Sequence, residues 1–211
     1  MKRQIIFCLL FFATFSLFAQ SNRQAERIIA DFINSVEQHA VRAEFEMIFL
    51  DINNRATQTQ HGIFRMRQDK FSFITDDFHV FFDGKTQWTY FDAVGEVSIT
   101  EPSIDELAEI NPILVLRAFQ NKSTIRFSIG DSSSENHSIE IIPNVPADFN
   151  RITVQINRAT GNLRSIHLIG NQGFSIQVSF RTFQRGLNIP DSYFVFDINN
   201  YDDDVFINDL R

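Results

Sequence analysis

The sequence predicts an α+β protein, mainly β: a curled antiparallel sheet of about eleven strands that forms an incomplete barrel, with about three α-helices as a lid over its concave apolar face. Apolar residues alternate with polar ones through most of the chain, which indicates strands with one apolar face. Three other segments have apolar residues at the spacing of a helix. A flat layer could not cover this much one-sided sheet, so we expect the sheet to curl around the helices.

The start of the chain is typical of a cleaved secretory signal peptide, for which we expect residues 1–19. Lys2 and Arg3 precede an apolar stretch too short to span a bilayer comfortably, and the small residue Ala19 precedes the expected cut. The alternative is an uncleaved amphipathic anchor. The only cysteine, Cys8, lies in this segment among the wrong neighbours for lipidation, so we expect no thiol, disulfide or thiolate metal ligand in the mature chain.

The rest of the chain, residues 20–211, is expected to form a single domain, because no repeat and no linker interrupts it. Loss of Lys2 and Arg3 would move the formal charge from -7 to -9. A surface this acidic argues against nucleic acid and anionic lipid headgroups as main ligands, because it cannot neutralise phosphate groups. We therefore expect a free, exported protein.

Three segments are expected to be helical. Residues 23–39 form one amphipathic helix, and residues 104–110 and 112–120 form two short helices that meet at a bend. Ser103 and Glu106 have the spacing of a capping box, and Asn111 followed by Pro112 indicates an N-cap with proline at the first helical position.

The strands are expected from their period of two and from the turn residues between them. They are placed around residues 45–49, 64–67, 71–73, 78–82, 87–91, 97–99, 125–129, 139–141, 152–156, 166–168, 174–180 and 193–196.

The hairpin FHVFFDGKTQWTYF, residues 78–91, concentrates aromatic side chains around one turn. An odd-length loop with Gly84 in the left-handed bulge position would place Phe78, Val80, Trp88 and Tyr90 on one face. A two-residue turn would put Trp88 and Tyr90 on the opposite face. The ring-rich face is either ordinary core or the wall of a large, partly unfilled apolar interior.

No catalytic or metal site is indicated. The GKT at residues 84–86 lacks the glycine that a phosphate loop needs five positions earlier, and no nucleophile elbow occurs. Five histidines are scattered without metal-ligand spacing, and the adjacent carboxylates are interpreted as solvated charge. These residues are His39, His61, His79, His137 and His167, then Asp76, Asp77, Asp105, Glu106 and Asp202 to Asp204. We expect no cofactor and no enzymatic activity.

The order of a leader, an amphipathic helix, HGIFRMRQDKFSF, FFDGKTQWTYFDAVGEVSI and a helix with NPILVLRAF resembles the periplasmic outer-membrane lipoprotein carrier family, the LolA type. The likeness runs from residue 23 to the terminal VFINDLR and is most specific at residues 62–99. It implies a half-barrel with a helical lid that acts as a periplasmic chaperone for lipoprotein transport. The acyl chains of the cargo would lie in an apolar cavity.

The resemblance also implies partners and a site. The partners would be acylated lipoproteins as cargo, an inner-membrane ABC-type release complex and a possible outer-membrane receptor, with the carrier itself a monomer. The lipid-binding cavity would comprise Phe45, Met47, Phe49, Phe64, Met66, Phe71, Phe73, Phe78, Val80, Trp88, Tyr90 and Ile99, and the lid Ile104, Leu107, Ile110, Ile113, Leu116 and Phe119.

One departure from the family pattern concerns lid closure. Many carriers have Lys-Arg-Pro where this chain has Arg67-Gln68-Asp69, so Gln68 aligns with the arginine implicated in closing the lid. Two alternatives stay open: Arg67 substitutes for that arginine, or closure is controlled differently.

Two other functions also stay open. A regulatory protein on the same fold would sense envelope stress by binding a membrane protein partner. A lipid-processing enzyme would use the scattered carboxylates.

Overall fold

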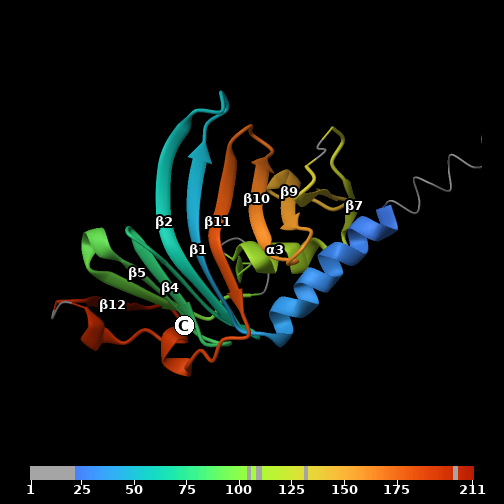
Figure 1. Ribbon diagram of the computed structural model, residues 1–211. Coiled ribbons are helices and arrows are strands. Elements are labelled where there is room, and N and C mark those ends of the chain that lie inside the picture. The colour runs from blue at the N-terminus through green and yellow to red at the C-terminus, as the bar shows by residue number, and fades with distance from the viewer. Residues whose placement is uncertain (1–21, 104–105, 108–110, 131–132, 202–203) are drawn as a thin grey trace, which may run out of the picture.

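The computed structural model describes residues 22–211 apart from 104–105, 108–110, 131–132 and 202–203. Twelve strands form one curled, open sheet in the order β12-β6-β5-β4-β3-β2-β1-β11-β10-β9-β8-β7 (Figure 1). They are β1 Val41–Leu50, β2 Ala56–Arg67, β3 Lys70–Thr75, β4 Phe78–Phe82, β5 Gln87–Phe91, β6 Glu96–Thr100, β7 Ser123–Phe127, β8 Asn136–Pro143, β9 Phe149–Asn157, β10 Leu163–Gly170, β11 Ser175–Arg185 and β12 Phe206–Asp209. The expected incomplete barrel is confirmed.

The strand expected at residues 193–196 is wrong. That stretch instead includes the 3-10 helix η2 Asp191–Phe194, and a further 3-10 helix, η3 Ile198–Asn200, follows it. The last strand is β12, which pairs with β6 in parallel, whereas the other neighbouring strands of the described sheet pair antiparallel. The physical reason is the burial of Phe194, whose side chain is fully buried and holds this stretch against a face of the sheet. Only the residues that follow it reach the edge of the sheet and pair as a strand.

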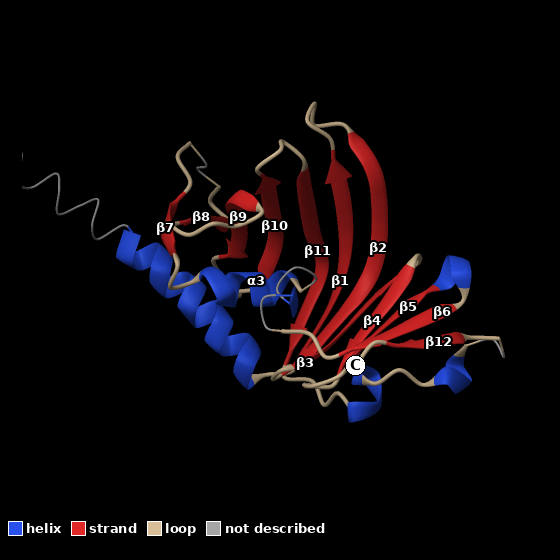
Figure 2. Cartoon of the chain, turned by 180° about the vertical axis from the view of Figure 1, so that it is seen from behind, coloured by secondary structure: helices blue, strands red, loops and turns tan. Residues whose placement is uncertain are grey.

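Two helical regions cover the concave face (Figure 2). The N-terminal helix, residues 22–38, buries Ala25, Ile29, Phe32, Ile33 and Val36. Helix α3, Pro112–Phe119, begins at the expected N-cap, where Asn111 Oδ1 accepts hydrogen bonds from the backbone N–H groups of Ile113 and Leu114 at 2.9 and 3.2 Å.

Of the helix expected at residues 104–110, only Glu106 and Leu107 belong to the described part of the chain, and both are helical. Its capping box is confirmed, since the Ser103 N–H donates to Glu106 Oε2 at 2.7 Å and the Glu106 N–H donates to Ser103 Oγ at 3.4 Å. Ile104 and Ile110 lie outside the described residues.

The apolar face of the sheet changes sides along the strand order. From β7 to β4 the apolar side chains face the helices and join one core that includes Phe45, Phe64 and Val80. From β4 to β12 the opposite, outer face carries Phe81 and Trp88. The C-terminal segment, residues 186–201, covers part of this outer face.

The register predicted for the β4–β5 hairpin is wrong. The strands pair Phe81 with Trp88 and His79 with Tyr90, and residues 83–86 form the loop, so Trp88 and Tyr90 lie on the face opposite to Phe78 and Val80. The side chain of Asp83 shapes the loop, accepting hydrogen bonds from the N–H groups at positions 85 and 86 at 2.9 and 2.8 Å. Tyr90 is still buried, because the Phe196 and Tyr201 rings of the C-terminal segment pack against it from outside, whereas Trp88 is only partly buried.

Candidate functional site

The interior beneath the helices is closed by stacked rings. Phe45 and Phe73 stack with ring centroids 4.5 Å apart, and Phe78 stacks on Phe73 at 5.9 Å. Gly62 makes room for this stack, because a Cβ there would lie 2.6 Å from Phe45 Cζ. This part of the concave face is packed core.

An apolar cleft of about 570 Å³ remains open beside this core. It lies between α3, the loop from β8 to β9 and the strands β10 and β11. Its lining is mostly aliphatic and aromatic: Val115, Ala118, Phe119, Lys122, Val145, Pro146, Ala147, Asp148, Phe149, Leu168, Gly170, Phe174 and Ile176.

The cleft arises where α3 ends. Leu168 and Ile176 are cross-strand neighbours on the apolar face of β10 and β11, and both are only partly buried. Helix α3 stops at Phe119, whose ring packs edge-to-face against Phe149 with centroids 4.8 Å apart. Beyond that contact the apolar face of the sheet is left without a helix above it.

The rim of the cleft carries exposed apolar side chains. Phe174 is 45% exposed and Val145 is 41% exposed. Ile52 is 70% exposed and lies so close to Gly173, next to Phe174, that a side-chain Cβ at that glycine would be 3.1 Å from Ile52 Cγ2. Lys122 and Asp148 are the only charged residues among the described lining. An apolar chain could therefore enter from solvent between largely uncharged walls.

The expected cavity residues divide into two groups. Phe45, Met47, Phe49, Phe64, Met66, Phe71, Phe73, Phe78 and Val80 belong to or pack against the closed core, as do Leu107, Ile113, Leu116 and Phe119 of the expected lid. Trp88, Tyr90 and Ile99 lie on the outer face, so the structure does not bring them together with Phe45. Of the members of this set that the structure describes, only Phe119 lines the open cleft.

Sequence analysis missed most of the cleft. The alternation around Leu168 and Ile176 predicted its strands, but the resemblance to the carrier family placed the cavity at other residues. The apolar stretch PNVPA, residues 143–147, was the available signal for the wall formed by the β8–β9 loop.

The structure does not bring Arg67 to the lid. Its guanidinium binds the Ile189 carbonyl and pairs with the Asp191 carboxylate, both in the C-terminal segment on the outer face. Gln68 is exposed in the β2–β3 turn with φ of 56°. The lid is instead tied through Arg117 of α3, which lies 3.3 Å from Glu37 of the N-terminal helix and 3.3 Å from Asp69 beside Gln68.

Among the described residues, no group of three or more His, Cys, Asp or Glu side chains is placed to hold a metal ion. His79, near the outer face, shares a 2.8 Å hydrogen bond with the Tyr201 hydroxyl, and burial lowers its pKa. No helix in the described part of the chain is long and apolar enough to cross a bilayer.

A curled open sheet, helices over its concave face and an apolar cleft beside them define the class of incomplete barrels with a helical lid. A family model described as outer membrane lipoprotein carrier protein LolA matches residues 15–144, which is more than half of the chain. The chain belongs to this family. No curated protein matches it by sequence.

Solved structures resemble the chain at low identity. An uncharacterized conserved protein from Thermus thermophilus has a TM-score of 0.57 and 10% identity, covering 86% of this chain and 96% of that one. A putative outer membrane lipoprotein-sorting protein domain from Vibrio parahaemolyticus gives 0.45 and 11%, covering 82% and 97%. A LolA superfamily protein from Nitrosomonas europaea gives 0.44 and 8%, covering 82% and 97%. Of these three, the first alone exceeds 0.5, and it supports the fold alone.

Proposed function

We propose that this protein is a periplasmic carrier that binds the acyl chains of lipoproteins and moves these lipoproteins from the inner to the outer membrane. The observation that carries the proposal is the open apolar cleft between α3 and the sheet, in a chain of the lipoprotein carrier family. The cargo would be acylated lipoproteins. An inner-membrane ABC-type complex would load the carrier, and an outer-membrane receptor is a further possible partner.

The cleft would hold acyl chains by removing them from water, which gains about 0.8 kcal/mol per buried methylene. It is too open to enclose a long chain fully, so α3 would move further from the sheet as the chain enters. Movement of α3 would expose its buried Ile113 and Leu116 and join the cleft to the ring stack around Phe73. The gain from the cargo offsets this lost packing, and the balance lets the carrier hold its cargo and still release it.

A binding assay with a synthetic triacylated lipopeptide tests this proposal. Ala118→Trp fills the cleft from α3, so we expect it to weaken lipopeptide binding at least about tenfold. Ala159→Trp is the matched control, because Ala159 is exposed in the β9–β10 turn, and its binding should equal that of the unmodified protein. Absence of binding, or equal binding by both variants, would contradict the proposal.

Two further measurements separate the proposal from the other functions. Mass spectrometry of the lipopeptide recovered from the complex should find it chemically unchanged, whereas a lipid-processing enzyme would convert it. Depletion of the protein from its cells should make lipoproteins accumulate at the inner membrane. Unchanged sorting, together with capture of a transmembrane signalling protein, would favour the sensor instead.

A further inference from the structure

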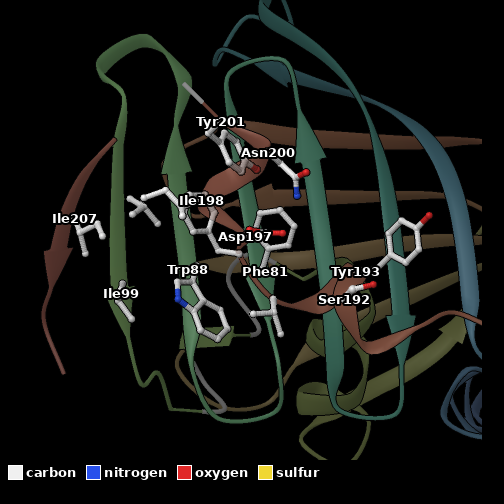
Figure 3. Close-up of a pocket in the computed structure, with 13 residues that line it drawn as sticks. Phe81, Trp88, Ile99, Ser192, Tyr193, Asp197, Ile198, Asn200, Tyr201 and Ile207 are labelled. Atoms are coloured by element: carbon white, nitrogen blue, oxygen red, sulfur yellow. The ribbon is translucent and has the colours of Figure 1, made fainter. Parts of the chain in front are cut away.

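A second pocket, of about 720 Å³, lies on the outer face of the sheet, away from the cleft (Figure 3). The C-terminal segment covers it, and β4, β5, β6 and β12 form its floor. The floor is built from cross-strand neighbours: Phe81 pairs with Trp88, Trp88 with Ile99, and Val97 with Ile207. Because these side chains lie on the outer face, the cleft and this pocket use opposite sides of one sheet.

The cover over the pocket is held at several points. Phe194 is fully buried, and the Lys70 ammonium lies 2.8 Å from the Asp191 carboxylate. Further along, the Tyr201 ring stacks on the Phe196 ring with centroids 4.6 Å apart. The pocket therefore has a fixed floor and an anchored cover, and its apolar space is formed without a ligand.

The charge around the pocket is mainly negative, although Arg67 and Lys70 pair with Asp191 and Arg65 lies over the Tyr193 ring at one end of the cover. Asp197 is the only charged residue among the described lining, and its carboxylate accepts hydrogen bonds from the Asn199 backbone N–H and side-chain amide at 3.0 and 2.7 Å. Residues 76–101 hold six acidic side chains and one lysine, and the described part of residues 186–211, without 202–203, holds four acidic side chains and one arginine. These two stretches, the acidic wing, carry -8 between them, although the whole chain carries only -7.

We propose that this pocket is the docking site for a basic protein segment that presents one apolar anchor side chain. The apolar floor at Phe81, Trp88 and Ile99 would bury the anchor. The acidic wing would attract the flanking lysines or arginines, and the ring faces of Phe81 and Trp88 favour cations close to them. An anionic membrane is disfavoured here, because its headgroups would be repelled by the same charges. The inference is independent of what the cleft carries.

Trp88 supplies the measurement, because it is the only tryptophan in the chain and lines the pocket. The probe is an amidated peptide of about twelve residues, composed of lysine and glycine with one central phenylalanine. We expect its titration to change Trp88 fluorescence saturably. Replacing its lysines by glutamate, or its phenylalanine by alanine, should weaken binding at least about tenfold, and raising the salt from about 50 to 500 mM should do the same.

Variants then place the peptide on the protein. Asp197→Asn keeps an oxygen that can accept the Asn199 hydrogen bonds, so it should fold normally and bind the lysine peptide about fivefold more weakly. Asp148→Asn, at the cleft on the other face, is the matched control and should bind like the unmodified protein. Phe81→Ala removes part of the floor and should weaken binding about tenfold.

The inference would be overturned if Trp88 fluorescence did not respond to the lysine peptide up to about 1 mM, or if the glutamate peptide bound equally well. Equal weakening of binding by the two aspartate variants would also overturn it. So would binding of the protein to anionic phosphatidylglycerol vesicles in place of the peptide. Lipopeptide binding in the cleft is measured separately, so failure here and failure of the carrier proposal are distinguishable.

Discussion

Arg117 of α3 lies with its Nη1 3.3 Å from the carboxylate of Asp69, in the turn between β2 and β3. Its Nε lies 3.3 Å from Glu37 of the N-terminal helix. One guanidinium thus ties the lid both to the sheet and to the neighbouring helix. These pairs are largely exposed, so each contributes only a small part of the stability and can break when α3 moves.

Arg117→Ala should therefore loosen α3 without unfolding the protein. We expect faster amide hydrogen exchange across residues 112–119 and a fall in the free energy of unfolding of less than about 1 kcal/mol. Arg181→Ala is the control, because Arg181 forms a similarly exposed pair with Glu46 on the outer side of the sheet. Unchanged exchange in α3 would show that these pairs do not hold the lid.

Gly62→Ala should destabilise the fold severely. A Cβ at this position would lie 2.2 Å from the Ile74 carbonyl oxygen and 2.6 Å from Phe45 Cζ, so backbone and ring would both have to move. We expect a loss of about 3 kcal/mol or more, measured by urea unfolding. Thr59→Ala, at an exposed position on the same strand, should change stability by less than about 0.5 kcal/mol. A stable Gly62→Ala protein would contradict the close approach.

Tyr201 should make stability fall at high pH. Burial raises its pKa to about 12, with the neighbouring Tyr90 and Asp92 adding to the shift. Between the unfolded pKa of about 10 and the folded value, the folded protein keeps a proton that the unfolded chain has lost, so its stability falls as pH rises through this window. Tyr201→Phe should remove this part of the loss.

The tyrosinate absorbance checks the same point. The unmodified protein should show a phase that titrates near pH 12, and Tyr201→Phe should lack it. Tyr193→Phe is the control and should keep that phase. Persistence of the phase in Tyr201→Phe would mean that another group causes it.

Phe194→Ala should release the C-terminal segment. The ring is fully buried and clusters with Ala40 and Ile189, so its removal should cost about 3–5 kcal/mol. Limited proteolysis should then cut within residues 186–201 first. Val195→Ala is the control, since Val195 is exposed and its truncation should leave cleavage unchanged. Equal protease resistance of both variants would mean that Phe194 does not anchor the segment.

Local sequence signals predicted the elements of the fold well. Period-two alternation located eleven of the strands, and the side chains of Ser103 and Asn111 act as the helix caps that their spacing indicated. These features depend on residues only a few positions apart, so a single sequence contains the whole signal.

The hairpin register and the cleft depended on distant parts of the chain. Tyr90, on the same face as Trp88, is buried on the outer side because Phe196 and Tyr201, more than a hundred residues later, pack against it. Leu168 and Ile176 line a cleft because α3 ends at Phe119 and leaves them without a cover. Neither relationship can be detected in the amino-acid sequence close to the residues concerned.

The central strand pair, β1 with β11, also determines when the molecule can fold. It joins residues as far apart as Val41 and Arg185, and the side-chain hydroxyl of Thr182 accepts the Glu44 N–H across 138 positions. Contacts between such distant residues slow folding, because the intervening chain must first be ordered. The sheet cannot be completed until almost the whole polypeptide is available. Slow folding of this kind would favour export of the chain in an unfolded state, the route that the signal peptide predicted from the sequence would require.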